Sequence, residues 1–113
     1  MNEAEGKLLT RAELQLMLHL WSLPGASGFV NDVRACYEEP RPAYTTVATF
    51  MKILSKKGFL RGVKTGNVIY YTARVARQQY LRETFDRICN EFFEGNAEMM
   101  RRYVEGEFQE NTK

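Results

Sequence analysis

Apolar residues recur at helical spacing near the start of the chain and predict a first helix. Its beginning is marked by Thr10-Arg11-Ala12-Glu13, a capping box in which the hydroxyl and the carboxylate each satisfy an amide at the helix start. The apolar positions follow at i, i+3, i+4 and i+7, and they are Leu14, Met17, Leu18 and Trp21. We expect this helix to end near Leu23, because Pro24-Gly25 cannot continue it.

A short second helix is predicted over about residues 30–37, after a loop at residues 25–28. Residues 38–42 contain two prolines and break the chain again. The residues expected on the buried side of the second helix are Val30, Val33 and Tyr37.

A third helix is predicted over about residues 43–57, and Gly58 is a natural residue to end it. Its apolar stripe consists of Val47, Phe50, Met51 and Leu54. Because successive residues turn by about 100°, the opposite face carries hydroxyl and ammonium groups, from Thr45, Thr49, Lys52 and Lys56. This helix therefore has one apolar face for packing and one polar, basic face for solvent.

Residues 59–64 and 68–72 are rich in β-branched and aromatic residues and predict a β-hairpin, with Thr65-Gly66-Asn67 as its turn. Two strands alone are marginally stable, so the hairpin is expected to pack on the helices. Three helices followed by a hairpin are the layout of a winged helix-turn-helix domain.

A long helix is predicted over about residues 74–93, followed by a short one over about residues 97–105. The apolar residues of the long helix repeat at a spacing suited to a partner helix, and they are Leu81, Phe85, Ile88 and Phe92. The short helix adds Met99, Met100, Tyr103 and Val104. This seam faces no other predicted element, which favours a second copy of the chain as its partner.

The predicted fold class is mainly α with a small β-hairpin. We expect residues 1–73 to form a winged helix-turn-helix domain and residues 74–113 to form a C-terminal helical dimerisation region.

Charge is distributed unevenly along the chain. The whole sequence has a formal net charge of +2, yet the stretch from Pro40 to Arg82 contains no acidic residue. It contains nine basic residues, which are Arg41, Lys52, Lys56, Lys57, Arg61, Lys64, Arg74, Arg77 and Arg82. A concentrated basic block in an otherwise acidic chain is the footprint expected of a surface that meets phosphate.

The basic block coincides with the third helix and the hairpin. A helix fits the major groove of DNA, where threonine can contact base edges and lysine can reach guanine or phosphate. Arg61 and Lys64 of the hairpin are placed to contact the adjacent backbone or the minor groove. The candidate DNA-binding residues are Arg41, Tyr44, Thr45, Thr46, Thr49, Lys52, Lys56, Arg61, Lys64 and Asn67.

Other chemistries find little support in the sequence. His19 is the single histidine, and no serine has a histidine and carboxylate pattern around it, so no catalytic residues are expected. Cys36 and Cys89 lie far apart without metal-ligand spacing, so neither a metal site nor a cofactor is expected. No segment is long and apolar enough for membrane insertion, and the polar N-terminus is unlike a signal peptide, so we expect a cytoplasmic protein.

The chain resembles the penicillinase-repressor (BlaI/MecI-type) family of winged-helix transcriptional regulators, which control β-lactamase and related genes. The likeness covers about residues 8–104 and is most specific from Ala43 to Leu60. Its matching segments are Leu9 to Leu14, Leu20-Trp21, Tyr44-Thr45-Thr46-Val47-Ala48-Thr49, Leu54-Ser55-Lys56-Lys57-Gly58-Phe59-Leu60 and Gly66 to Tyr71.

The resemblance implies a dimeric repressor that binds a palindromic double-stranded DNA operator. It implies that Thr45, Thr46, Thr49 and Lys52 contact the major groove, with Arg61 and Lys64 on the backbone. It also implies a homodimer interface built from Leu81, Phe85, Ile88, Phe92, Met100, Tyr103 and Val104.

In one branch of the family, a membrane sensor-protease leads to cleavage of the repressor at an Asn-Phe bond, and such a sensor is a possible upstream partner. Arg102-Tyr103 stands at that place in this chain, which argues against inactivation by that route. The pair of Cys-x-Cys motifs that marks a copper-responsive branch is missing from this sequence.

Two alternative functions remain open at this level. The first is a winged-helix regulator of another family, with a small-molecule pocket lined by Tyr80, Phe85, Phe92 and Phe93. The second is a protein-interaction module that uses the same scaffold without binding DNA.

Overall fold

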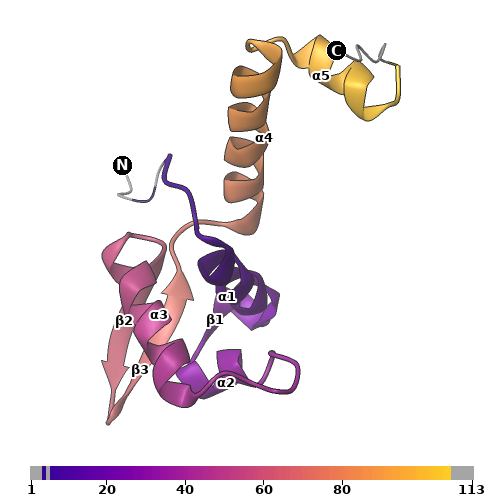
Figure 1. Ribbon diagram of the computed structural model, residues 1–113. Helices are drawn as coiled ribbons and strands as arrows, with labels where there is room; N and C mark the ends of the chain where they lie inside the picture. The colour runs from indigo at the N-terminus through magenta and orange to yellow at the C-terminus, as the bar shows by residue number, and fades with distance from the viewer. Residues whose placement is uncertain (1–3, 5, 108–113) are drawn as a thin grey trace. The chain divides into compact units, whose positions relative to one another are not determined.

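The computed structural model describes residue 4 and residues 6–107. The chain divides into two compact units, Met1–Arg77 and Gln78–Lys113. Five helices and a small antiparallel sheet confirm the predicted fold class, with the sheet confined to the first unit. In chain order the elements are α1 (Arg11–Ser22), η1 (Pro24–Ala26), β1 (Ser27–Gly28), α2 (Val30–Arg34), α3 (Tyr44–Lys56), β2 (Leu60–Thr65), β3 (Val68–Ala73), α4 (Arg77–Phe93) and α5 (Ala97–Val104) (Figure 1).

Helix α1 begins at the predicted capping box. The Glu13 amide donates to Thr10 Oγ1 at 3.2 Å, and the Thr10 amide donates to Glu13 Oε1 at 2.9 Å. The predicted buried stripe is wrong by one residue, because Leu18 is 45% exposed and Leu14 and Trp21 are half-buried. The buried residues are Glu13, Leu16, Met17 and Leu20. Both sets have the same helical spacing, so the apolar pattern alone does not choose between them.

The buried carboxylate of Glu13 determines which face of α1 packs into the core. Lys57, at the end of α3, donates to both carboxylate oxygens, at 2.9 Å to Oε1 and 2.7 Å to Oε2. Burial acts to raise the pKa of Glu13, but the hydrogen bonds from Lys57 and Thr10 and the charge of Lys57 together bring it below its ordinary value. Lys57 thus holds α1 against α3. Because its charge is paired with Glu13, it does not add to the basic surface.

We expect Lys57→Met to lower the free energy of unfolding at pH 7 by about 2 kcal/mol, because it leaves the Glu13 carboxylate buried without its partner. The pKa of Glu13 is lowered in the folded state. Its ionised carboxylate therefore contributes to folding stability at pH values above its ordinary pKa of 4.5, and this contribution is lost as pH falls through the lowered pKa. The difference between variant and wild type should therefore shrink towards pH 3 in chemical denaturation curves. Lys56→Met, at the neighbouring exposed position, should change stability by less than about 0.5 kcal/mol at either pH.

Helices α2 and α3 carry the predicted apolar faces with small changes. Val30 and Val33 are buried as predicted, but α2 ends at Arg34, and Tyr37 is half-buried against the His19 ring at a centroid distance of 4.3 Å. Helix α3 ends before Gly58, whose φ is 93°. Its buried residues are Val47, Met51 and Leu54, while Phe50 is half-buried.

The sheet has three strands in the order β1-β3-β2. The hairpin of β2 and β3 is confirmed, and Thr65 pairs with Val68, so the turn is Gly66-Asn67 alone. The prediction of a simple loop at residues 25–28 is wrong, because β1 pairs with β3 through Ser27 and Gly28. The two residues of β1 are too few for the alternation of apolar and polar residues that marks a strand in the sequence. A side chain at Gly28 would place its Cβ 2.9 Å from Leu23 Cδ1, so glycine permits this close packing.

The connection from β3 to α4 also differs from the prediction. The long helix begins at Arg77 rather than at residue 74. Val75 is buried, and the indole nitrogen of Trp21 donates to its carbonyl oxygen at 2.9 Å. Residues 74–76 therefore belong to the packing of the first unit, and this long-range bond explains why helical periodicity does not locate the helix start.

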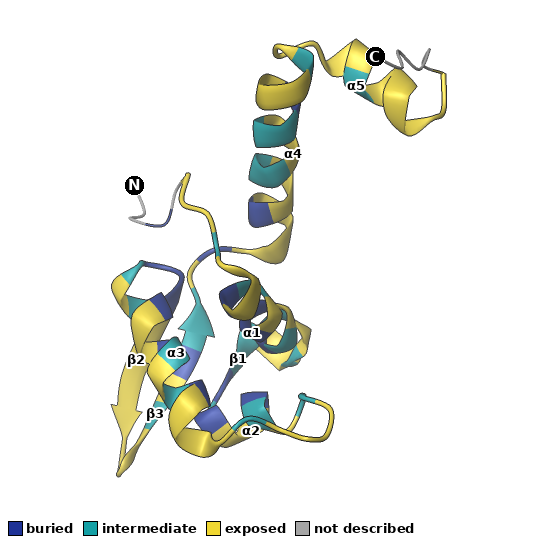
Figure 2. Ribbon diagram, in the orientation of Figure 1, coloured by how far each residue is buried: buried dark blue, intermediate teal, exposed yellow. Residues whose placement is uncertain are grey.

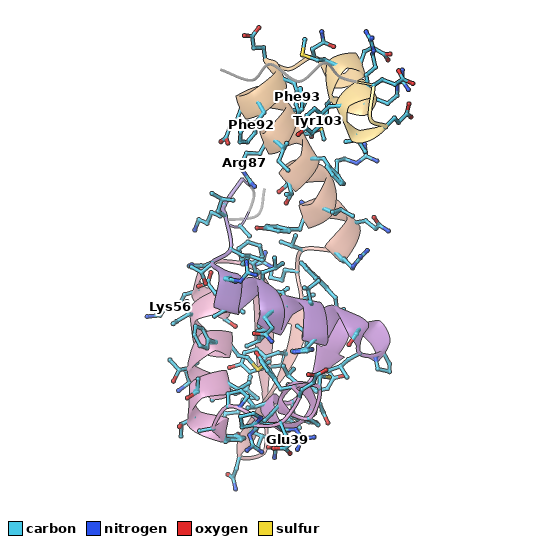
Figure 3. All side chains as sticks on the ribbon, turned by 45° about the vertical axis from the view of Figure 1, so that its right-hand side comes forward. Glu39, Lys56, Arg87, Phe92, Phe93 and Tyr103 are labelled. Atoms are coloured by element: carbon cyan, nitrogen blue, oxygen red, sulfur yellow. The ribbon has the colours of Figure 1, made fainter. Side chains whose placement is uncertain are left out.

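Helices α4 and α5 make up the second unit. Asn96 caps α5 by accepting a hydrogen bond from the Met99 amide at 3.0 Å, and α5 has no buried residue (Figure 2). The rings of Phe93 and Tyr103 join the two helices at a centroid distance of 5.7 Å (Figure 3). Several large apolar side chains of this unit are exposed in the single chain, among them Leu81, Phe85, Phe92, Met99, Tyr103 and Val104.

Candidate nucleic-acid interface

The polar face of α3 is exposed along the whole helix. Thr45, Thr49, Lys52 and Lys56 are all exposed, as the helical spacing predicts, and Figure 3 shows Lys56 extending outward from α3. Tyr44, the first residue of the helix, is 43% exposed. The buried residues of α3 anchor the opposite face, so the fold presents this row of side chains to solvent.

Thr46 lies apart from that row. It comes one residue before the buried Val47, so its side chain is turned by about 100° from the core direction and is not on the outward stripe. It borders a hollow of about 650 Å³ formed with α1 and the segment after α2. Thr46 and Thr45 therefore face different surroundings, although the sequence places them side by side.

The two predicted basic residues of the hairpin lie on opposite faces of the ribbon. Lys64 pairs with Ile69 in the strand register and shares a groove with Lys52 and Lys56 of α3. Arg61, three residues earlier in the same strand, lines a separate hollow with Arg74. The structure thus joins Lys64 to the α3 face and separates Arg61 from it.

Arg41 and Asn67 occupy more distant positions. Arg41 donates to the Glu39 carboxylate at 2.6 Å and to the Tyr37 carbonyl at 3.1 Å, so its charge is partly neutralised. Asn67 is an exposed residue of the hairpin turn. Arg34 donates to the Pro42 carbonyl at 2.7 Å and fixes the segment that leads into α3.

The four basic residues on the polar face of α3 and on strand β2 have no ion pair with an acid among residues 4 and 6–107. They are Lys52, Lys56, Arg61 and Lys64. Glu39, which pairs with Arg41, is outside the acid-free stretch, and Glu13 forms its ion pair with Lys57. Uncompensated positive charge therefore lies on the outward side of α3 and on the hairpin.

The groove between α3 and the hairpin contains residues that the sequence did not single out for binding. Ser55 lies on its wall, with Gly62 and Tyr71 on the hairpin side. Ser55 follows Lys52 by three residues, so helical spacing could have placed it at the edge of the basic stripe. The pKa of Tyr71 is raised by burial and by the neighbouring Tyr44, so the Tyr71 phenol stays neutral near pH 7.

The single histidine lies in the hollow beside Thr46. Its Nε2 is shielded from solvent and makes no hydrogen bond to any described residue, and burial lowers the pKa of the imidazole. Over residues 4 and 6–107, no group of three or more His, Cys, Asp or Glu side chains is arranged to hold a metal ion. Cys36 borders the same hollow, whereas Cys89 is buried in α4.

Comparison with known proteins identifies the family. The family model described as Penicillinase repressor matches residues 9–111 of the 113-residue chain. The chain belongs to the penicillinase-repressor family. No curated protein sequence matches it. The predicted resemblance of the chain to this family is thereby confirmed.

The penicillinase-repressor family is a regulatory family of DNA-binding transcriptional repressors. This agrees with a helix-rich chain in which a small antiparallel sheet packs beside α3. No described helix is long and apolar enough to cross a membrane. The individual DNA-contacting and dimer-interface residues remain predictions.

Proposed function

We propose that this penicillinase-repressor family member is a sequence-specific repressor that inserts α3 into the major groove of an operator. The observation that carries the proposal is the exposed row of Thr45, Thr49, Lys52 and Lys56, with no acidic partner for either lysine in the described chain. Threonine side chains contact base edges or the thymine methyl group, and lysines contact guanine or phosphate. The hairpin is then the wing that contacts the backbone.

We further propose that the repressor acts as a homodimer held by α4 and α5. Leu81 is 37% exposed, Phe85 49% and Phe92 74%, and they follow each other at helical spacing on α4. Ile88, Met100, Tyr103 and Val104 complete the proposed interface. A row of exposed apolar side chains on a long helix is typical of a surface that a second copy covers.

A palindromic operator follows from the dimer. Closed two-fold dimers present two identical recognition helices related by the same axis, so the preferred DNA repeats its half-site in inverted orientation. Residues 1–73 are the proposed DNA-binding part, and the following helices are the proposed dimerisation part. The bound partner is double-stranded DNA, and no cofactor is required in this proposal.

The test is a titration of the wild-type chain and Thr49→Ala with two duplexes at several salt concentrations. One duplex is selected by the wild type from a random pool, and the other has a scrambled sequence. Wild-type affinity should fall steeply with salt, with a log–log slope of about −0.9 for each phosphate contacted. Thr49→Ala should lose about 1–3 kcal/mol on the selected duplex and little on the scrambled one, with an unchanged slope.

Three results would contradict this proposal. Binding of the wild type that does not depend on salt, or no enrichment of any sequence from the pool, would overturn the proposed function. Equal losses for Thr49→Ala on both duplexes would show that this side of α3 does not read bases.

A further inference from the structure

A basic groove runs between α3 and the hairpin. Its volume is about 410 Å³, which is near the low end of the range for small-ligand sites. Its lining residues are Lys52, Ser55, Lys56, Gly62, Lys64, Ile69 and Tyr71. Three ammonium-bearing side chains from two different elements therefore border one space.

Local structure explains why these side chains share the groove. Lys52, Ser55 and Lys56 are spaced i, i+3 and i+4 on α3, so they lie along one side of the helix. On the hairpin, Lys64 pairs with Ile69 and Gly62 pairs with Tyr71, so all four belong to the same face of the ribbon. A Cβ at Gly62 would lie 2.8 Å from Ile69 Cγ2, so a side chain there would displace the wall of the groove.

The charge of the groove is not compensated within the protein. None of Lys52, Lys56 and Lys64 forms an ion pair with an acid in the described part of the chain. Like charges that share a space repel one another, and an anion between them removes that repulsion.

Ser55 adds a polar group that also lacks a partner. Its hydroxyl oxygen is shielded from solvent and makes no hydrogen bond to any described residue. A buried hydroxyl without a partner is costly, and an acceptor brought to it recovers that cost. A serine hydroxyl reorients by rotation about a single side-chain bond, so it can turn towards an oxygen in the groove.

We propose that this groove is a clamp for one DNA backbone phosphate, held jointly by α3 and the wing. Lys56 and Lys64 contact the same phosphate from opposite walls, with Lys52 beside them, and the Ser55 hydroxyl donates to a phosphate oxygen. The clamp fixes how α3 is rotated in the major groove, because one phosphate ties the helix to the wing. This inference rests on the proposed DNA binding.

The number of phosphates can be counted from the salt dependence. Lys56→Ala, Lys64→Ala and the double variant are titrated with the selected duplex over a range of salt concentrations. If the two lysines share one phosphate, the double variant reduces the log–log slope by about one, and each single variant reduces it by less. A reduction of about two in the double variant would assign the lysines to separate phosphates and overturn the clamp.

The position of the phosphate is located by replacing each backbone phosphate of the duplex in turn with a neutral methylphosphonate. At one position the wild type should lose about tenfold in affinity, Lys56→Ala and Lys64→Ala should each lose less than the wild type, and the double variant should lose no more than about twofold. Ser55→Ala should weaken binding to the unmodified duplex about threefold. When the phosphate at that position is replaced by the neutral group, Ser55→Ala should bind the duplex as tightly as the wild type does. Neighbouring phosphates serve as controls, and equal losses for the wild type and both lysine variants at every position would overturn the clamp.

The two proposals fail in different ways. A wild type that does not bind DNA in a salt-dependent manner contradicts the proposed function itself. A wild type that binds as expected, with the two lysines assigned to different phosphates, contradicts only the clamp.

Discussion

Phe85→Asp is expected to raise the dissociation constant of the proposed dimer by at least about 100-fold. Burying one phenylalanine side chain contributes about 1.5–3 kcal/mol, and two-fold symmetry places two copies in the interface. An aspartate there would also have to lose its hydration without a cation beside it. Because Phe85 is 49% exposed in the single chain, its replacement should leave the fold of the protomer intact.

Sedimentation velocity over a range of protein concentrations measures this effect. Asn90→Asp is the matched control, since it adds the same charge to an exposed position of α4 on another side of the helix. The control should remain a dimer, and circular dichroism should show the same helix content for both variants. A Phe85→Asp variant that sediments like the wild type at every concentration would place the interface elsewhere.

Leu54→Ala is expected to lower the free energy of unfolding by about 2–5 kcal/mol and to weaken DNA binding at 37 °C with it. Leu54 is fully buried on the apolar face that holds α3 in the first unit, and its truncation leaves a cavity there. A loss of this size is a large part of the stability of a small domain, so a measurable fraction of the variant should be unfolded.

Ile53→Ala is the control for this core substitution. Ile53 is the neighbouring aliphatic residue on α3 and is 37% exposed, so its truncation should cost about 1 kcal/mol or less. Urea denaturation of both variants, followed by DNA titration at 10 °C and 37 °C, separates stability from recognition. Equal stability losses for the two variants would mean that Leu54 is not part of the packing core.

Local chemistry makes much of the fold predictable from the sequence. The capping box at Thr10 and Glu13, the apolar face of α3 and the hairpin turn at Gly66-Asn67 all depend on residues close together in the chain. The incorrect predictions concern elements whose structure is determined by residues far apart in the sequence. The start of α4 depends on a bond from Trp21 to Val75, and β1 exists only through its pairing with β3.

In the candidate interface, too, local spacing predicts some features and tertiary packing determines the others. The outward row of α3 follows from helical spacing, so Thr45, Thr49, Lys52 and Lys56 are exposed as predicted. The groove that adds Lys64 and Ser55 forms only when the hairpin packs beside α3, and no local pattern encodes that approach. Strand alternation could have separated Arg61 from Lys64, because residues three apart in a strand face opposite sides.

The bond between Trp21 and Val75 has a practical consequence for spectroscopy. Trp21 is the single tryptophan of the chain, and its indole nitrogen is tied to the segment that leads into α4. Fluorescence excited at the red edge of protein absorption therefore comes from the first unit alone, whereas the second unit is silent. Emission spectra follow the melting of the α3-containing unit, and far-ultraviolet dichroism follows both units, so the two signals together distinguish sequential from concerted unfolding.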